Sequence, residues 1–503
     1  MNRTIRTFGI FVMVLFVAMV AQLANVQLVQ AHKLNHDPRN TRQAVADFSR
    51  ARGAIQTADG TVIAQSVPSN DQYKYQRVYP EKSLYAFLTG FLSFRYGAEG
   101  AERTYGADLA GRNLPLSSTN LRHLFDSGQR TANVTLTVTA ALQKTTVAAL
   151  GNQVGAVVAI DPRDGSILSL VSQPTYDPNE LASHNPNAEQ ASFKGLSADP
   201  GRPMLPRVYR ESYAPGSTFK VITASAVYDK KPDLATKTYP TLTNLPLPQT
   251  KNQLHNFGGE SCGGQLPDLL RISCDTGFAA IGLDLGGDAL SGEAVQFGFR
   301  QIPPLDLPGV FSSGFPLAST FKNALPLLAF SAIGQSNVSA TPLQMALVAA
   351  GIANHGTIMT PHVMKEVRDS DGTLVRSWQP KPWLTATTAP TADQIKALMV
   401  SVVTGGTGTG VAIPGVTVAA KTGTAEVDAA HTNAWMIAFA PAENPTVAVA
   451  AVLPGLTGVG NESSGGVRAA PIVRAVLQAV LAAQASPAPN GAPPNPGAAP
   501  GQG

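Results

Sequence analysis

The sequence predicts a mixed α/β protein in which an antiparallel sheet is flanked by helices. Strand candidates at 416–421, 434–440 and 447–453 follow one another through short turns, which favours antiparallel neighbours. A helical pattern at 469–483 closes this region. The chain has 503 residues, which exceeds one ordinary core, so we expect two domains beside a membrane segment.

An apolar stretch occupies the N-terminus. Residues 8–21 are wholly apolar, and the stretch continues with interleaved amide side chains to residue 29. Some 22 residues, at about 1.5 Å each, just cross a hydrocarbon core of about 30 Å. No small-residue cleavage site follows, so an uncleaved signal anchor at 8–29 with a cytoplasmic tail at 1–7 is favoured over a removed signal peptide. Basic residues flank both ends of the stretch and do not settle its orientation.

The rest of the chain divides into three segments that differ in composition and in the pattern of apolar residues. Segment 30–135 has short mixed elements without recognisable chemistry, and we interpret it as a pedestal module. Segment 485–503 is uncharged and rich in Pro, Gly and Ala, so it cannot bury a core and is predicted to be disordered. The larger domain is expected at 136–484, with helices at 140–150, 342–354 and 392–403 and strands at 156–160 and 167–171.

Composition argues against several classes of partner. Only 14% of residues are charged and the net charge is +4, which is too mild and dispersed for nucleic acid binding. The eight histidines show no metal-ligand spacing, and His32 and His36 lack acidic or cysteine companions. We therefore expect neither a metal nor a cofactor.

The stretch Ala214-Pro215-Gly216-Ser217-Thr218-Phe219-Lys220 predicts a nucleophile. Pro and Gly break the preceding segment, so a helix can begin at Ser217, and Lys220 then shares its face. A neutral lysine amine can take the serine proton if burial lowers its pKa, which requires an enclosed site. A second copy, Ser319-x-x-Lys322, follows no Pro-Gly break, and we interpret it as an ordinary amphipathic segment.

Two further motifs follow Ser217. Lys421-Thr422-Gly423-Thr424 is the only Lys-Thr-Gly in the chain and provides a cation, hydroxyls and close backbone approach for a carboxylate. Ser273-Cys274-Asp275 opens a helical run at 276–285 and is the best downstream match to Ser-x-Asn. The literal matches at 118–120 and 183–185 precede the nucleophile.

Together these motifs resemble those of class B penicillin-binding proteins, which are peptidoglycan D,D-transpeptidases. The similarity is greatest to the actinobacterial penicillin-binding protein A type and covers about residues 8–484. Further stretches that resemble the family are 40–42, 52–55, 102–105, 155–161, 165–168, 174–179 and 340–346.

The resemblance implies the penicillin-binding transpeptidase fold, with an all-helical subdomain beside the sheet and an N-terminal module of the dimerisation type. It also implies that Ser217 forms an acyl-enzyme with stem peptides or β-lactams, that Lys220 is the base, and that Ser273 relays a proton to the leaving amine. The backbone N–H groups of Ser217 and Thr424 would form the oxyanion hole. Substrate would be bound by Asp275, Lys421, Thr422, Gly423 and Thr424.

Asp275 and the two cysteines leave alternatives open. Aspartate stands where the family has asparagine, and an ionised carboxylate only accepts hydrogen bonds and favours a charged Lys220. The alternative is that Asp275 caps the helix at 276. Cys262 and Cys274 are the only cysteines and form either a disulfide or two free thiols.

The resemblance further implies a single-pass cell-membrane protein whose catalytic domain is extracytoplasmic. Its expected partners are a membrane glycosyltransferase and other cell-wall or division proteins. Two other functions remain as alternatives: a β-lactamase-like or β-lactam-sensing acyl-serine protein, and a non-catalytic cell-wall scaffold with a degenerate middle motif.

Overall fold

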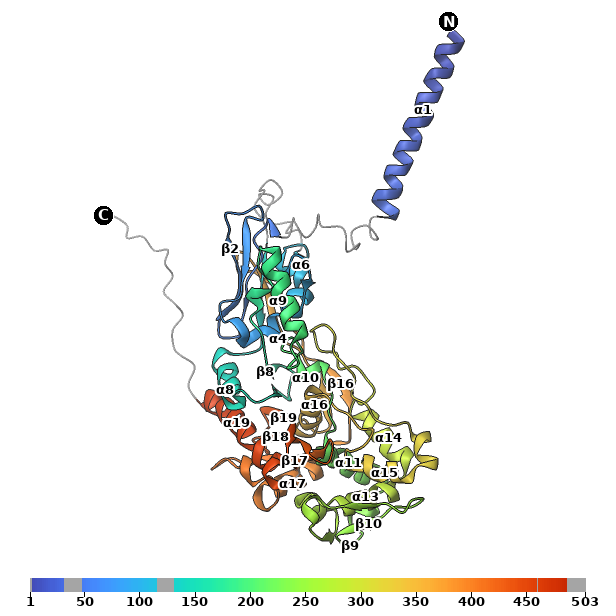
Figure 1. Ribbon diagram of the computed structural model, residues 1–503, viewed down its shortest axis with the longest axis vertical. Helices are drawn as coiled ribbons and strands as arrows, with labels where there is room; N and C mark the ends of the chain where they lie inside the picture. Colours follow the sequence, from blue (N-terminus) through green and yellow to red (C-terminus); the bar gives the residue numbers. More distant parts are fainter. Residues whose placement is uncertain (1, 31–47, 115–130, 459, 486–503) are drawn as a thin grey trace, which may run out of the picture.

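The computed structural model describes residues 2–30, 48–114, 131–458 and 460–485. At the N-terminus, helix α1 (Asn2–Ala24) continues as a π-helical turn, η1 (Asn25–Val29) (Figure 1). Within the span Arg3–Gln27, an 18-residue window has a mean hydropathy of 2.3 and none of that window is buried, so this helix is long and apolar enough to cross a membrane. The predicted tail at 485–503 lies, apart from Ala485, outside the described residues.

The centre of the larger region is a five-stranded sheet in the order β17-β18-β19-β7-β8. Every neighbouring pair is antiparallel. The predicted antiparallel sheet with flanking helices is therefore confirmed. Its strands are β7 (Gly155–Ile160), β8 (Ile167–Gln173), β17 (Ala419–Glu426), β18 (His431–Ala440) and β19 (Val447–Thr457).

Helices cover both faces of this sheet because its strands are apolar on both sides. On β18, Trp435 and Ile437 point to one core, whereas Met436 and Ala438 point to the other. The second core is closed by α8 (Ala140–Leu150) and α19 (Ala470–Ala485). The predicted helices at 140–150 and 469–483 are thus confirmed.

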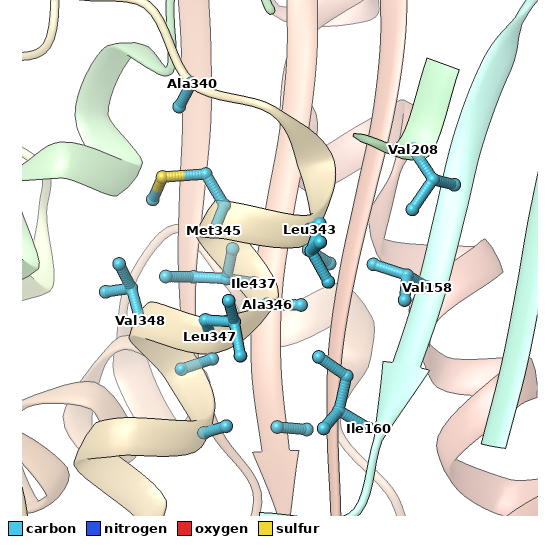
Figure 2. Close-up of a cluster of buried hydrophobic side chains, with 14 of the residues drawn as sticks. Val158, Ile160, Val208, Ala340, Leu343, Met345, Ala346, Leu347, Val348 and Ile437 are labelled. Atoms are coloured by element: carbon cyan, nitrogen blue, oxygen red, sulfur yellow. The ribbon is translucent and has the colours of Figure 1, made fainter. Parts of the chain in front are cut away.

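The first core is organised around α16 (Pro342–Ala353), all of whose residues are buried. Figure 2 shows Leu343, Ala346 and Leu347 lying between this helix and strand residues such as Val158 and Ile437. Thr341 caps the helix through Oγ1, which accepts the Gln344 N–H at 3.1 Å, and Pro342 occupies its first position. Truncating a buried leucine such as Leu343 to alanine should cost about 2–5 kcal/mol.

A group of helices packs beside the sheet and carries the site segments. They are α11 (Lys220–Lys230), α12 (Leu266–Arg271), α13 (Asp275–Leu285), α14 (Gly287–Gln296), α15 (Leu325–Ala332) and α17 (Ala389–Gly405). Their apolar faces join the same core as α16. The predicted helices at 276–285 and 392–403 lie within α13 and α17.

The N-terminal module contains a six-stranded sheet in the order β15-β14-β6-β1-β2-β3. Its strands are β1 (Ile55–Gln56), β2 (Val62–Pro68), β3 (Tyr75–Val78), β6 (Ala132–Leu136), β14 (Met364–Asp369) and β15 (Leu374–Ser377). Beside the sheet, Arg52 and Arg77 both pair with the fully buried Glu102. These buried charges are mutually paired, as burial requires.

Two segments of the larger predicted domain return to this module. The hairpin β14–β15 pairs with β6, and Arg376 on β15 makes two bonds of 2.7 Å to the Asp108 carboxylate. Helix α9 (Pro186–Ala198) also packs there, since Phe193 stacks on Tyr96 at 3.8 Å between ring centroids. The sequence analysis did not anticipate either return, because a strand pattern does not identify its partner strand. The domain division at 135 stays a prediction.

Candidate active site

Ser217 lies on a single turn that precedes helix α11 and packs against strand β17. The turn is 3-10 helical, η4 (Gly216–Phe219), and α11 begins only at Lys220, so the predicted helix at Ser217 starts one turn later than expected. Gly216 has φ +53°, and a Cβ there would lie 2.8 Å from the carbonyl oxygen of Thr424. Glycine at this position therefore allows the Ser217 turn to approach strand β17. The Ser217 side chain remains at the surface of the cleft, with 8% of the residue exposed.

Lys220 is fully buried and faces α13. Its Nζ donates to the Asp275 Oδ1 at 2.7 Å and to the Ser273 carbonyl at 2.6 Å, and lies 3.4 Å from Ser273 Oγ. Among the described residues no hydrogen bond links Lys220 to Ser217. Burial lowers the pKa of Lys220, and the neighbouring Asp275 carboxylate opposes that change.

Lys421 lies within β17, where the Lys-Thr-Gly motif forms the middle of the strand. The strand was predicted at 416–421 but spans Ala419–Glu426, because residues 413–416 fold into a tight turn closed by an Ile413–Val416 bridge. Lys421 Nζ donates to Ser273 Oγ at 2.8 Å and to the Thr422 carbonyl at 3.0 Å. Burial and the nearby Lys220 charge place the pKa of Lys421 well below its usual range.

Ser273 therefore lies between the two lysines. It occupies the junction of α12 and α13 and has φ +61°, a left-handed conformation that costs a non-glycine residue about 1–3 kcal/mol. This conformation accompanies the bonds of both its carbonyl and its hydroxyl to buried amines. Strain of this kind is typical of functional sites.

Asp275 joins Lys220 to a neighbouring loop. Its Oδ2 accepts the Phe257 N–H at 3.1 Å, and the Asn256 Oδ1 accepts the Thr276 N–H at 2.8 Å. The N-terminus of α13 has no side-chain cap from within the helix, and Asn256 satisfies it from outside. The alternative in which Asp275 caps this helix is wrong, because its carboxylate faces Lys220 and Phe257.

The disulfide Cys262–Cys274 ties the same loop to the site, with a Cα–Cα distance of 5.8 Å. Cys262 begins β12 (Cys262–Gly264), and Cys274 separates Ser273 from Asp275. The loop at 256–262 is thus held to the start of α13 by one covalent bond and by hydrogen bonds that include those of Phe257 and Asn256.

The remaining motif residues on β17 pack tightly against the Ser217 turn. Thr422 Oγ1 lies 2.6 Å from Thr407 Oγ1. A Cβ on Gly423 would lie 2.8 Å from the Pro215 carbonyl oxygen, so only glycine allows this approach. Thr424 accepts the Gly465 N–H at 3.4 Å. Carboxylate binding by these residues and the oxyanion hole stay predictions.

A cleft with two lobes opens on either side of Ser217. One lobe of about 590 Å³ extends toward Gln335 and Glu426, and the other, of about 580 Å³, extends toward Thr407 and Ser464. Both volumes are in the range of ligand sites. Both lobes are lined by Ser217, Asn256, Phe257, Asp275 and Thr424.

The other motif copies are not brought into this cleft. Ser319 and Lys322 are exposed on η7 (Ala318–Asn323), as expected for a structural segment. In the 183–185 match, Asn185 caps α9 through its side chain. The 118–120 match and His32 and His36 lie outside the described residues.

Several cleft residues were missed by the sequence analysis. Asn256, Phe257 and Thr407 lie in loops without a motif, and only the folded chain places them beside Ser217. Gly465, which lies between the cleft residues Ser464 and Gly466, was missed as well, and a Cβ there would lie 1.9 Å from the Trp435 carbonyl oxygen. The glycine pair at 465–466 was the one available indication of such close packing.

Comparisons with known proteins bear on both regions. The penicillin binding protein transpeptidase domain matches residues 155–478, and the penicillin binding protein A dimerisation domain matches residues 52–134. The peptidoglycan D,D-transpeptidase PbpA of Mycolicibacterium smegmatis is 38% identical over 500 residues, covering 96% of this chain and 99% of the relative. PbpA of Mycobacterium tuberculosis is 37% identical over 497 residues, covering 96% and 99%.

Solved structures give the same result. The ceftriaxone acyl-enzyme complex of penicillin-binding protein A from M. tuberculosis has a TM-score of 0.80 at 36% identity and covers 87% of this chain and 100% of its own. The imipenem acyl-enzyme complex of the same protein has the same TM-score, identity and coverage. These matches, together with the five-stranded sheet and the two lysines that contact Ser273, show that the chain belongs to the penicillin-binding protein transpeptidase family.

Proposed function

We propose that this protein is a membrane-anchored peptidoglycan D,D-transpeptidase that cross-links stem peptides through an acyl-enzyme on Ser217 and is acylated by β-lactams. The observation that carries the proposal is the convergence of the motifs: Ser273 contacts both Lys220 and Lys421 at the floor of the cleft that contains Ser217. The PbpA relatives bear the name of this activity, and M. tuberculosis penicillin-binding protein A forms acyl-enzymes with three β-lactams.

The proposed chemistry begins with attack by Ser217 Oγ on the carbonyl between two terminal D-alanines. Lys220 in its neutral form accepts the hydroxyl proton, and the backbone N–H groups of Ser217 and Thr424 stabilise the oxyanion. Ser273, hydrogen-bonded to Lys421, passes a proton to the departing D-alanine amine. An acceptor amine from a second peptide then takes the acyl group and regenerates Ser217.

Substrate binding is proposed for the β17 edge and α13. Lys421, Thr422 and Thr424 hold the terminal carboxylate beside the close approach at Gly423, and Asp275 contacts the peptide. Asp275 and Thr424 line both lobes and Thr422 lines one of them, which supports this, because a donor and an acceptor strand must meet at the same serine. No cofactor takes part in these steps.

We further propose that α1 is the membrane anchor and that the domains after residue 30 are extracytoplasmic. The apolar helix and the disulfide support this placement, since disulfides persist in oxidising compartments. The proposed partners are a membrane glycosyltransferase and other cell-wall or division proteins, and the match to a dimerisation domain suggests that residues 52–134 make protein contacts.

Labelling by a fluorescent penicillin tests the proposal. The full-length protein should become covalently labelled, and Ser217→Ala should abolish labelling. Ser319→Ala is the matched control, because it removes the exposed serine of the other Ser-x-x-Lys copy and should leave labelling unchanged. Labelling that survives Ser217→Ala would contradict the assignment, and rapid nitrocefin turnover would favour a β-lactamase instead.

A further inference from the structure

Asp275, the last residue of the middle motif, makes polar contacts with both Lys220 and the 256–262 loop. Its two carboxylate oxygens are both engaged, one by the Lys220 ammonium at 2.7 Å and one by the Phe257 N–H at 3.1 Å. The Lys220 side chain is fully buried and 13% of the Asp275 side chain is exposed. In a charge pair that is largely removed from water, the Asp275 carboxylate stabilises the ammonium form of Lys220.

The surroundings of Lys220 leave Asp275 as its counter-ion. From β17, Lys421 is the other charged group that faces the same pocket, and it repels rather than neutralises. From α13, the Phe278 ring lies 5.4 Å from Lys220 Nζ and favours a cation. Among the described residues no other carboxylate pairs with Lys220 or Lys421.

This arrangement opposes the first chemical step. Ser217 needs a neutral amine to accept its proton, whereas Asp275 stabilises the ammonium form. An asparagine at 275 could still accept a hydrogen bond from Lys220 through its carbonyl oxygen, but it would carry no charge. The difference between the two residues is therefore mainly electrostatic.

We propose that Asp275 is a positioning residue that holds Lys220 as an ammonium ion in the resting site, so that acylation of Ser217 requires more alkaline conditions than asparagine at this position would impose. The inference rests on the proposed function, in which Lys220 is the base. It does not depend on which lysine limits the rate, because Asp275 favours the charged form of Lys421 as well.

The test measures the second-order rate of acylation by a fluorescent penicillin between about pH 5 and 9, with full-length protein in detergent. In Asp275→Asn the acid limb of the profile should move down by about one pH unit, which makes acylation about tenfold faster below the limb and less different at alkaline pH. Asp275→Ser, a second neutral variant, should shift the limb in the same direction. Asp275→Glu keeps the charge and should keep the limb.

Asp268→Asn is the control for the substitution itself. Asp268 is exposed on α12 and pairs with Arg271 away from both lysines, so its profile should superimpose on that of the wild type. An acid limb that coincides in the wild type and both neutral variants would overturn the inference. So would a rate reduced by the same factor at every pH, which is what a purely structural role produces. Wild-type protein that is not acylated at any pH would instead overturn the proposed function, and the inference with it.

Discussion

The buried carboxylate of Glu293 makes a prediction whose size follows from the structure. Glu293 lies on α14 with no exposed surface, and neither carboxylate oxygen has a hydrogen-bond partner among the described residues. The nearest cation, Lys230 Nζ, forms an ion pair with Glu293 at the long distance of 3.5 Å and also donates a hydrogen bond to Gln296. Burial and the neighbouring Asp229 carboxylate raise the pKa of Glu293 from 4.5 to about 8.

A raised carboxyl pKa makes the fold less stable as the pH rises. Below pH 4.5 the group is protonated in both the folded and the unfolded state, and the fold has its full stability. Between pH 4.5 and about 8 the unfolded chain releases the proton and the folded chain retains it, so the free energy of unfolding falls. About 2.5 pH units separate 4.5 from neutrality, and at ~1.4 kcal/mol each this loss is roughly 3 kcal/mol at pH 7.

Glu293→Gln should remove this loss, because glutamine resembles the protonated acid and its amide can donate to Asp229. The thermal unfolding midpoint of the variant should exceed that of the wild type by several degrees at pH 7–8 and by little at pH 4.5. Glu180→Gln, which changes an exposed glutamate on a surface turn, is the control and should show no such trend. A difference between variant and wild type that does not grow with pH would refute the reasoning.

Two further predictions concern the anchor and the disulfide. Full-length protein should fractionate with membranes and retain its N-terminus. A chain that begins at His32 should be soluble and still bind penicillin. A mature protein that begins between Ala21 and Lys33 would contradict the proposal that α1 is a membrane anchor. Cys262→Ser should lower the free energy of unfolding by about 2–4 kcal/mol. It should also slow acylation, because the 256–262 loop forms hydrogen bonds with Asp275 and Thr276. Reduction of the disulfide in the wild type should reproduce both effects. Unchanged stability and acylation in the reduced wild type would show that hydrogen bonds alone hold the loop.

The fold was predictable where local patterns dominate. Helices at 140–150 and 342–354 followed from apolar periodicity and, for the second, from Thr341 and Pro342 at its start, and both are present, the second as Pro342–Ala353. Strand β17 begins three residues and ends five residues later than predicted, because apolarity marked Val416 and Val418 but could not reveal the turn that precedes the strand. Long-range pairing was beyond the sequence, since nothing in residues 364–377 specifies β6 as the partner.

For the candidate site, the residue types could be predicted from the sequence, but their contacts could not. Its charged and hydroxyl residues were found from motif spacing, and the structure brings Ser217, Lys220, Ser273 and Lys421 to one cleft. The contact of Lys220 with Asp275, rather than with Ser217, could not be read from spacing, because it depends on the rotation of α13 and the left-handed backbone at Ser273. The role of Asn256 could not be predicted for the same reason, because its side chain accepts a hydrogen bond from Thr276 on a helix twenty residues later.

The return of the β14–β15 hairpin to the N-terminal sheet limits how this protein can be divided. Any fragment that starts at residue 136 retains β14 but lacks β6, and so presents an unpaired strand edge where Val367 should be covered. Such a fragment is expected to aggregate even if its cleft is intact, and poor behaviour would then say nothing about catalysis. For crystallisation or inhibitor screening, the shortest useful chain begins before Ile55, so that both sheets keep all their strands.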